Sequence, residues 1–144
     1  MSVSYQENAL TAEALAGLRT QAGWSHTLIE QAHKALDHTI YSISAFDEGE
    51  IVGMGRLVGD GAMVWYIQDV IVLPPYRQVG VGSTIVRKLT DYAVKESMPG
   101  TNIAIALMSA KDKEPFYEKL GFLVRPNDHE GAGMMMRVKV PDLP

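Results

Sequence analysis

The segment from residue 63 to residue 97 constrains the fold most strongly, because it joins a strand to a helix through a short glycine-containing connection. Residues 63–73 form the most pronounced β-prone run of the chain. Pro74 and Pro75 end this run, since proline cannot donate a hydrogen bond to a sheet. Apolar side chains then recur at helical spacing and predict a helix over residues 81–97. A strand that leads directly into a helix predicts a layered α/β structure.

The rest of the chain extends this pattern as one domain over residues 1–144, because no linker, repeat or long charge block divides it. Gly53 and Gly55 lie inside a predicted strand and indicate a bulge or the close approach of another backbone. The order of the predicted elements favours a mixed sheet with helices beside it. These elements are helices at 11–22 and after Ser25, strands at 40–46, 50–58 and 102–108, a short helix at 113–120, and closing strands at 122–126 and 133–139.

The composition excludes several classes of protein. Of the 144 residues, 47% are hydrophobic and 21% are charged, as in an ordinary globular domain. The absence of cysteine excludes disulfides, thiolate nucleophiles and cysteine-bound zinc. The net charge of -4 argues against nucleic-acid binding, which requires a basic surface. There is neither a secretory signal nor an apolar run of about 20 residues, so we expect a cytoplasmic location and no membrane partner.

The histidines do not have the spacing of metal ligands. His33 and His38 are five positions apart, whereas a zinc pair on one helix face is separated by four. We therefore expect no metal site.

The connection between strand and helix has the features of a phosphate-binding loop. Gly80 and Gly82 lack Cβ atoms, so a phosphate can approach the backbone closely. The N–H groups and the dipole of the following helix favour an anion there. Arg77 adds a cation and Ser83 a hydroxyl donor. A dinucleotide-binding motif would need glycine in place of Ile85, and the Gly-Lys-Ser/Thr of a P-loop is also missing.

Two motifs resemble those of one known family. The first is PPYRQVGVG at residues 74–82, which is similar to the coenzyme A motif of the GCN5-related N-acetyltransferases (GNAT family). The second runs from Lys113 to Phe122 and resembles the family's short helix, in which a tyrosine, here Tyr117, precedes a Leu-Gly-Phe ending. With their flanking elements, the two motifs span about residues 64–122.

The resemblance implies a mixed, mostly antiparallel sheet in which two parallel strands, 63–73 and 102–108, splay apart. Acetyl-CoA, the implied cosubstrate, would lie between these strands. Its pyrophosphate would lie over residues 77–83, the connection that contains Gly80 and Gly82, which we call the glycine loop. Many relatives carry asparagine where this chain has Ala110, and Ser109 or Lys111 is a candidate to replace that contact. The cofactor-binding residues implied by the resemblance are Val70, Ile71, Val72, Arg77, Gln78, Val79, Gly80, Val81, Gly82 and Ser83.

The implied reaction is direct attack of a primary amine on acetyl-CoA, with Tyr117 as the general acid that protonates the departing thiolate. The alternative for Tyr117 is a core aromatic packed with Phe116 and Phe122. Gln68 is a candidate to accept a proton or hold a water. Strand alternation predicts that Asp69 faces the other side of the sheet.

The acceptor remains open as a small-molecule or peptide amine, with the segment around Trp24 and His26 as a candidate pocket. The resemblance also admits a homodimer formed through the C-terminal strands. Two other functions stay open: a non-catalytic acyl-CoA-binding or regulatory module, and a simple phosphate-ligand binding domain.

Overall fold

The computed structural model describes residues 2–143 of the chain, which fall into two units divided between Leu107 and Met108. The first unit holds the sheet and three α-helices, and the second holds one short helix and the C-terminal segment. No helix in the described part of the chain is both long and apolar enough to cross a membrane.

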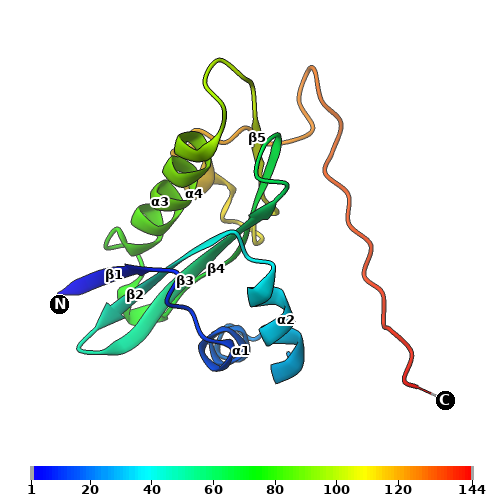
Figure 1. Cartoon of the computed structure of the whole chain (residues 1–144). Helices are drawn as coiled ribbons and strands as arrows, with labels where there is room; N and C mark the ends of the chain where they lie inside the picture. Colours follow the sequence, from blue (N-terminus) through cyan, green and yellow to red (C-terminus); the bar gives the residue numbers. More distant parts are fainter. Residues whose placement is uncertain (1, 144) are drawn as a thin grey trace. The chain divides into compact units, whose positions relative to one another are not determined.

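The first unit is built on a five-stranded sheet of mixed type (Figure 1). The first four strands are antiparallel neighbours, whereas the last two are parallel, which confirms the expected mostly antiparallel sheet. In spatial order the strands are β1 (Val3–Glu7), β2 (Tyr41–Asp47), β3 (Glu50–Gly59), β4 (Val64–Val72) and β5 (Ala104–Ala106). β1 was not predicted from the sequence, and the strand predicted at 102–108 is longer than the observed β5.

Helices cover both faces of this sheet. Figure 1 shows α1 (Ala12–Gln21) and α2 (Ile29–Asp37) on one face and α3 (Val81–Glu96) on the other. The three helices confirm the predicted ones. Thr11 caps α1, since its hydroxyl accepts a hydrogen bond from the N–H of Ala14 at 3.1 Å.

The two glycines of β3 let α3 lie close to the sheet. A Cβ atom added at Gly55 would lie 2.7 Å from Cγ2 of Ile85 and 2.9 Å from Cδ1 of Leu89. The register of β3 against β4 also shifts between Met54 and Arg56, on either side of Gly55. A close approach is therefore confirmed, by side chains of α3 at Gly55 and by the carbonyl of Ile71, 3.2 Å from a Cβ built at Gly53, whereas the extra residue of the bulge lies on β4, opposite Gly55.

The second unit contains α4 (Glu114–Glu118), and Gly121 follows it with a φ of +100°. The short helix was predicted, but the closing strands at 122–126 and 133–139 are wrong: the described residues there form no strand. The side chains of Met134 and Val138 are 89% and 67% exposed. A β-prone run becomes a strand only where another strand supplies hydrogen bonds, and the described residues of this unit, 108–143, contain no strand.

Candidate active site

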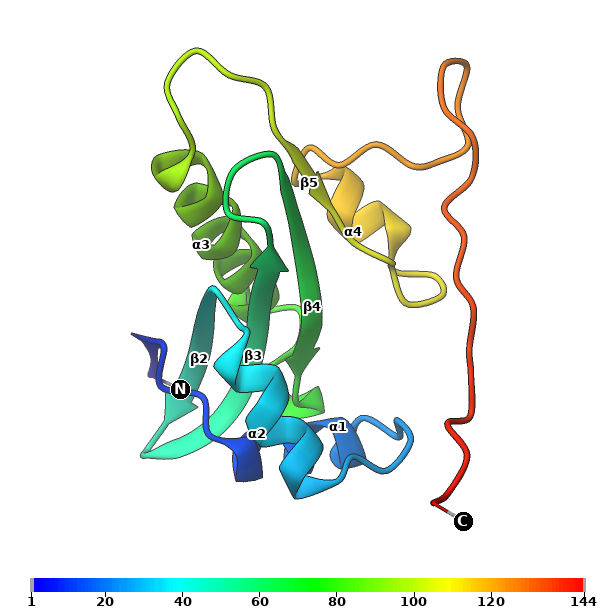
Figure 2. The same cartoon turned by 45° about the vertical axis from the view of Figure 1, so that its right-hand side comes forward.

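One edge of β4 is paired only at its beginning. The parallel pairing with β5 runs from Val64 opposite Ala104 to Tyr66 opposite Ala106. Figure 2 shows β5 beside this first part of β4. The later part, residues 67–72, has no neighbour on that side among the described strands of the sheet. Unpaired strand edges offer backbone N–H and C=O groups to an extended ligand.

The same stretch of β4 carries a bulge. Gln68 pairs with Arg56 and Ile71 pairs with Met54, so Asp69 and Val70 both lie opposite Gly55. Asp69 has a φ of +58°, in the left-handed region that favours glycine. An extra residue of this kind bends a strand and re-aims its side chains.

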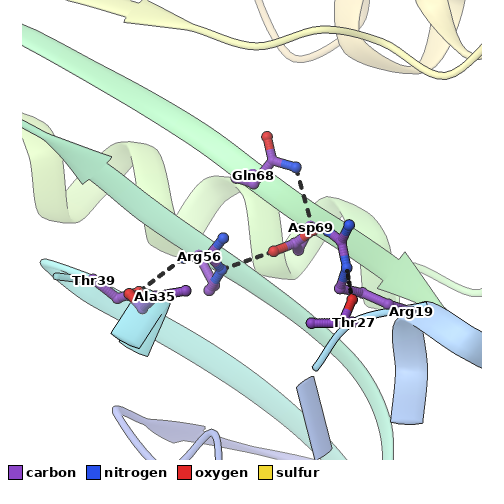
Figure 3. A network of polar contacts seen from close by, with 7 residues as sticks. All are labelled: Arg19, Thr27, Ala35, Thr39, Arg56, Gln68 and Asp69. Atoms are coloured by element: carbon purple, nitrogen blue, oxygen red, sulfur yellow. Dashed lines mark hydrogen bonds and ion pairs between the residues drawn. The ribbon is translucent and has the colours of Figure 1, made fainter. Parts of the chain in front are cut away.

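The bulge overturns the predicted alternation of side chains along β4. Nε2 of Gln68 donates a hydrogen bond to Oδ1 of Asp69 at 3.2 Å (Figure 3). Neighbouring side chains of a regular strand point to opposite faces and do not meet in this way. The expectation that Gln68 and Asp69 face opposite sides of the sheet is therefore wrong at this position.

Asp69 lies between two guanidinium groups (Figure 3). Nη1 of Arg19, from α1, donates to Oδ1 of Asp69, and Nε of Arg56, from β3, donates to Oδ2 at 2.8 Å. Two threonine hydroxyls hold the arginines: Oγ1 of Thr27 accepts from Nε of Arg19, and Oγ1 of Thr39 accepts from Nη1 of Arg56, each at 2.9 Å. Sequence reasoning missed both arginines. The available signal was a charged residue, Arg56, inside an otherwise apolar strand.

A cavity of about 260 Å³ lies beside this network. Its walls come from α1, α2, the loop between them, β3 and β4, and they include Arg19, His26, Gln31, Arg56 and Asp69. The loop predicted as a candidate acceptor pocket therefore does border a cavity, through His26. The ring of Trp24 instead lies against Arg19, with its centroid 4.9 Å from Cζ of that arginine.

The glycine loop ends where α3 begins. Gly80 precedes the first helical residue with a φ of +95°, and Gln78 has a φ of +62°. The N–H of Thr84 is bonded to the carbonyl of Gly80 at 3.0 Å. The first three N–H groups of the helix, at residues 81–83, have no acceptor within it. Nε of Arg77 donates to the carbonyl of Val72 at 2.8 Å and so joins the loop to the end of β4.

Two of the predicted cofactor-binding residues have buried side chains. Ile71 is 4% exposed and Val81 is 3% exposed. Both belong to the apolar core, so only their backbone groups are available to a ligand. Val79 is 58% exposed and its side chain is free to contact one.

Tyr117 lies in α4, in the second unit, whereas Gln68 and the glycine loop belong to the first. Its ring meets those of Phe116 and Phe122 edge-on, with centroid separations of 4.9 and 5.9 Å. Burial raises the pKa of the Tyr117 phenol above its usual value. The phenol is therefore protonated at neutral pH, as a proton donor must be.

Ala110, the departure from the family motif, is also in the second unit. Oγ of Ser109 donates to the Ala110 carbonyl at 2.7 Å, and Lys111 is exposed. Between residues 2 and 143, no group of three or more histidine, aspartate or glutamate side chains is arranged to hold a metal ion.

Comparison with known proteins agrees with this architecture. A family model described as "Acetyltransferase (GNAT) family" matches residues 9–122. An uncharacterized N-acetyltransferase of Porphyra purpurea is 26% identical over 113 residues, which are 76% of this chain and 63% of that protein. The chain thus spans less than two thirds of the length of that relative.

Solved structures show the same fold. One of them is a protein of unknown function from meticillin-resistant Staphylococcus aureus, described as a probable acetyltransferase. It is 28% identical to this chain with a TM-score of 0.83, and the match covers 95% of this chain and 100% of that protein's chain. An aminoglycoside N-acetyltransferase in complex with CoA is 16% identical with a TM-score of 0.66, over 96% of this chain and 95% of its own. With the family match over residues 9–122 and the open edge of β4 leading into the glycine loop, the chain belongs to the GNAT family of acetyltransferases.

Proposed function

We propose that this chain is an N-acetyltransferase, acting as a single domain, that transfers the acetyl group of acetyl-CoA to a primary amine. One observation carries the proposal: the open, bulged part of β4 leads through the glycine loop directly into the N-terminus of α3. Backbone groups for a thioester and N–H donors for a phosphate thus follow one another along 15 positions, residues 69–83.

In this proposal acetyl-CoA binds mainly to backbone. The backbone groups of Val70, Ile71 and Val72 contact the pantetheine arm and the acetyl carbonyl along the free edge of β4. Residues 77–83 bind the pyrophosphate, because the free N–H groups at the start of α3 and the positive end of its dipole both favour an anion. A Cβ built at Gly80 would have no neighbour within 4 Å, so no other atom of the protein obstructs a phosphate that approaches Gly80 from that side.

The reaction requires a neutral amine, whereas a free lysine side chain has a pKa of about 10.4. The amine nitrogen attacks the acetyl carbonyl carbon, and backbone N–H groups of the β4 bulge stabilise the oxyanion that forms. The C–S bond then breaks, and the Tyr117 phenol protonates the thiolate. The acceptor ammonium loses one proton to water before the attack, the nitrogen loses a second proton to water after the C–N bond forms, and a proton from solvent restores the Tyr117 phenol. We assign Gln68 the positioning of the accepting water through Oε1, since a carboxamide does not itself take up a proton.

The test is calorimetric titration of CoA into the protein, followed by measurement of free thiol released from acetyl-CoA with a panel of amines. CoA binding and amine-dependent thiol release are expected. The variant Gly82→Trp fills the loop with a side chain and should abolish CoA binding while the protein stays folded by circular dichroism. Normal CoA binding by this folded variant would contradict the loop assignment. CoA binding by the wild type with no turnover of any amine would favour the acyl-CoA-binding module instead.

A further inference from the structure

The proposed function does not say which amine is the acceptor. The residues that line the 260 Å³ cavity indicate the chemical class of that amine. We propose that the acceptor amine carries an anionic oxygen group, a carboxylate or a phosphate, which Arg19 and Arg56 bind in this cavity. This inference rests on the proposed function, because it names the class of amine that the acetyltransferase uses.

The first argument is the balance of charge. Arg19 and Arg56 both line the cavity, and the carboxylate of Asp69 is the single acidic partner of either one among residues 2–143. Two cations therefore share one anion. Arg56 is only 9% exposed and Asp69 only 3%, whereas the side chain of Arg19 is 24% exposed, so water screens Arg19 more than the other two charges. A positive charge in excess at a partly buried site is costly, and an anionic ligand would supply the missing counter-charge.

The second argument is the set of donors that remain. Each guanidinium uses Nε and Nη1 on described residues, which leaves Nη2 of both arginines for a ligand. Asp69, by contrast, already accepts three hydrogen bonds, from Arg19, Arg56 and Gln68. The network therefore offers more to a carboxylate or phosphate than to an ammonium group. The planar guanidinium also matches the geometry of both anions.

The third argument is preorganisation. The hydroxyls of Thr27 and Thr39 accept hydrogen bonds from the two guanidinium groups, and the Trp24 ring lies against the guanidinium group of Arg19. A ligand that meets side chains already held in place loses less entropy on binding. The cavity is also slightly smaller than the about 300–1,000 Å³ of typical ligand pockets, which favours a small acid.

The experiment compares acceptors in pairs that differ only in the acidic group. Glucosamine 6-phosphate is set against glucosamine, and β-alanine against β-alaninamide, with acetyl-CoA saturating. We expect kcat/KM for the anionic member of at least one pair to exceed that of its neutral partner by roughly tenfold or more, the usual effect of a hydrogen bond between charged groups. The pair with the larger difference tells whether the group is a phosphate or a carboxylate.

Variants locate the effect. Arg19→Gln leaves Asp69 paired with Arg56, and it should remove the preference for the anionic acceptor mainly by raising KM. Arg19→Lys keeps the charge and should retain part of the preference. Arg87→Gln makes the same change of charge at an exposed position of α3 and should leave the preference intact. Thermal melting of each variant verifies its fold.

Calorimetric titration of the same acceptors, with and without CoA, separates the two proposals. If the wild type releases thiol equally with neutral and anionic amines, the acceptor proposal is wrong and the acetyltransferase stands. If CoA does not bind but an anionic acceptor does, and Arg19→Gln weakens it, the anion site stands without the proposed function. If neither anionic acceptor binds in either titration, the anion site is wrong.

Discussion

A carboxylate that is 3% exposed within an apolar strand requires cations beside it, and Asp69 has two. The carboxylate joins α1 to β3 and β4, because Arg19 and Arg56 come from different elements. Its role in the site is to hold the two guanidinium groups in place. Removing it would leave them facing each other without a counter-charge.

We therefore expect Asp69→Asn to lower the free energy of unfolding by about 3 kcal/mol, the usual cost of breaking a buried ion pair. Urea denaturation monitored by circular dichroism measures this change. Asp91→Asn, the same substitution at an exposed position of α3, is the matched control and should change stability little. Equal stability of the two variants would show that the network does not support the fold.

Tyr117→Phe should reduce kcat by about a hundredfold, the lower range of general acid–base catalysis, while CoA affinity and stability are unchanged. The phenylalanine ring keeps the contacts with Phe116 and Phe122, so only the proton donor is lost. Because burial raises the pKa of Tyr117, the wild-type phenol stays protonated beyond the usual tyrosine value of about 10. Measured kcat should therefore show no decline from this group below about pH 10. Identical rates for variant and wild type at every pH would remove Tyr117 from the reaction.

The residues of the candidate site differ in how far sequence could predict them. The glycine loop follows from a local pattern, because the strand, the glycines and the helix are contiguous. The pairing of Arg19 with Asp69 joins residues 50 positions apart, and no local pattern encodes it. The predicted orientation of the Asp69 side chain was wrong because strand alternation assumes a regular register, and the bulge interrupts the register between β3 and β4.

Among the elements, the contact between α3 and β3 depends on missing side chains. Gly55→Ala places a methyl group against Ile85 and Leu89, so we expect it to lower the free energy of unfolding by about 1–3 kcal/mol, the cost of overpacking a core. Gly17→Ala, inside α1 with no neighbour within 4 Å, is the matched control and should raise stability by about 0.5–1 kcal/mol. Urea midpoints give both values. Stabilisation by both substitutions would show that α3 moves freely away from the sheet.

Helices were predicted more reliably than strands, for a physical reason. The hydrogen bonds of a helix are local, so the apolar spacing in residues 81–97 was enough to predict α3. A strand needs a partner from elsewhere in the chain. The unpredicted β1 exists because β2 pairs with it, whereas residues 133–139, which are the more apolar of the two segments, form no strand.

For the whole molecule, three of the six tyrosines should resist ionisation. Burial raises the pKa of Tyr41, whose hydroxyl also donates to Glu7 at 2.7 Å, and the hydrogen bond to Asp47 raises that of Tyr76. Burial does the same for Tyr117. Since the folded state binds these protons more tightly, the stability they contribute is fully present below the usual tyrosine pKa of about 10 and is lost at higher pH.

We therefore expect the free energy of unfolding to fall as the pH rises above about 10. Urea denaturation at a series of alkaline pH values, together with phenolate absorbance, measures this. Tyr41→Phe removes the hydroxyl while the ring stays available for stacking on Tyr92, 4.0 Å away, so its stability should depend less steeply on pH. A slope as steep as that of the wild type would show that Tyr41 does not contribute.

The bulge at Asp69 and Val70 depends on one extra residue in β4. A β4 shorter by one residue at this point would pair with β3 without interruption and would gain regular hydrogen bonds. If Asp69 were the residue removed, Ile71 would still lie opposite Met54 and keep its face, but the carboxylate between Arg19 and Arg56 and the bend beside the open edge of β4 would both be lost. A single-residue deletion could therefore improve the sheet and still destroy the site, which makes the spacing between Gln68 and Gly80 as informative as the identity of either residue.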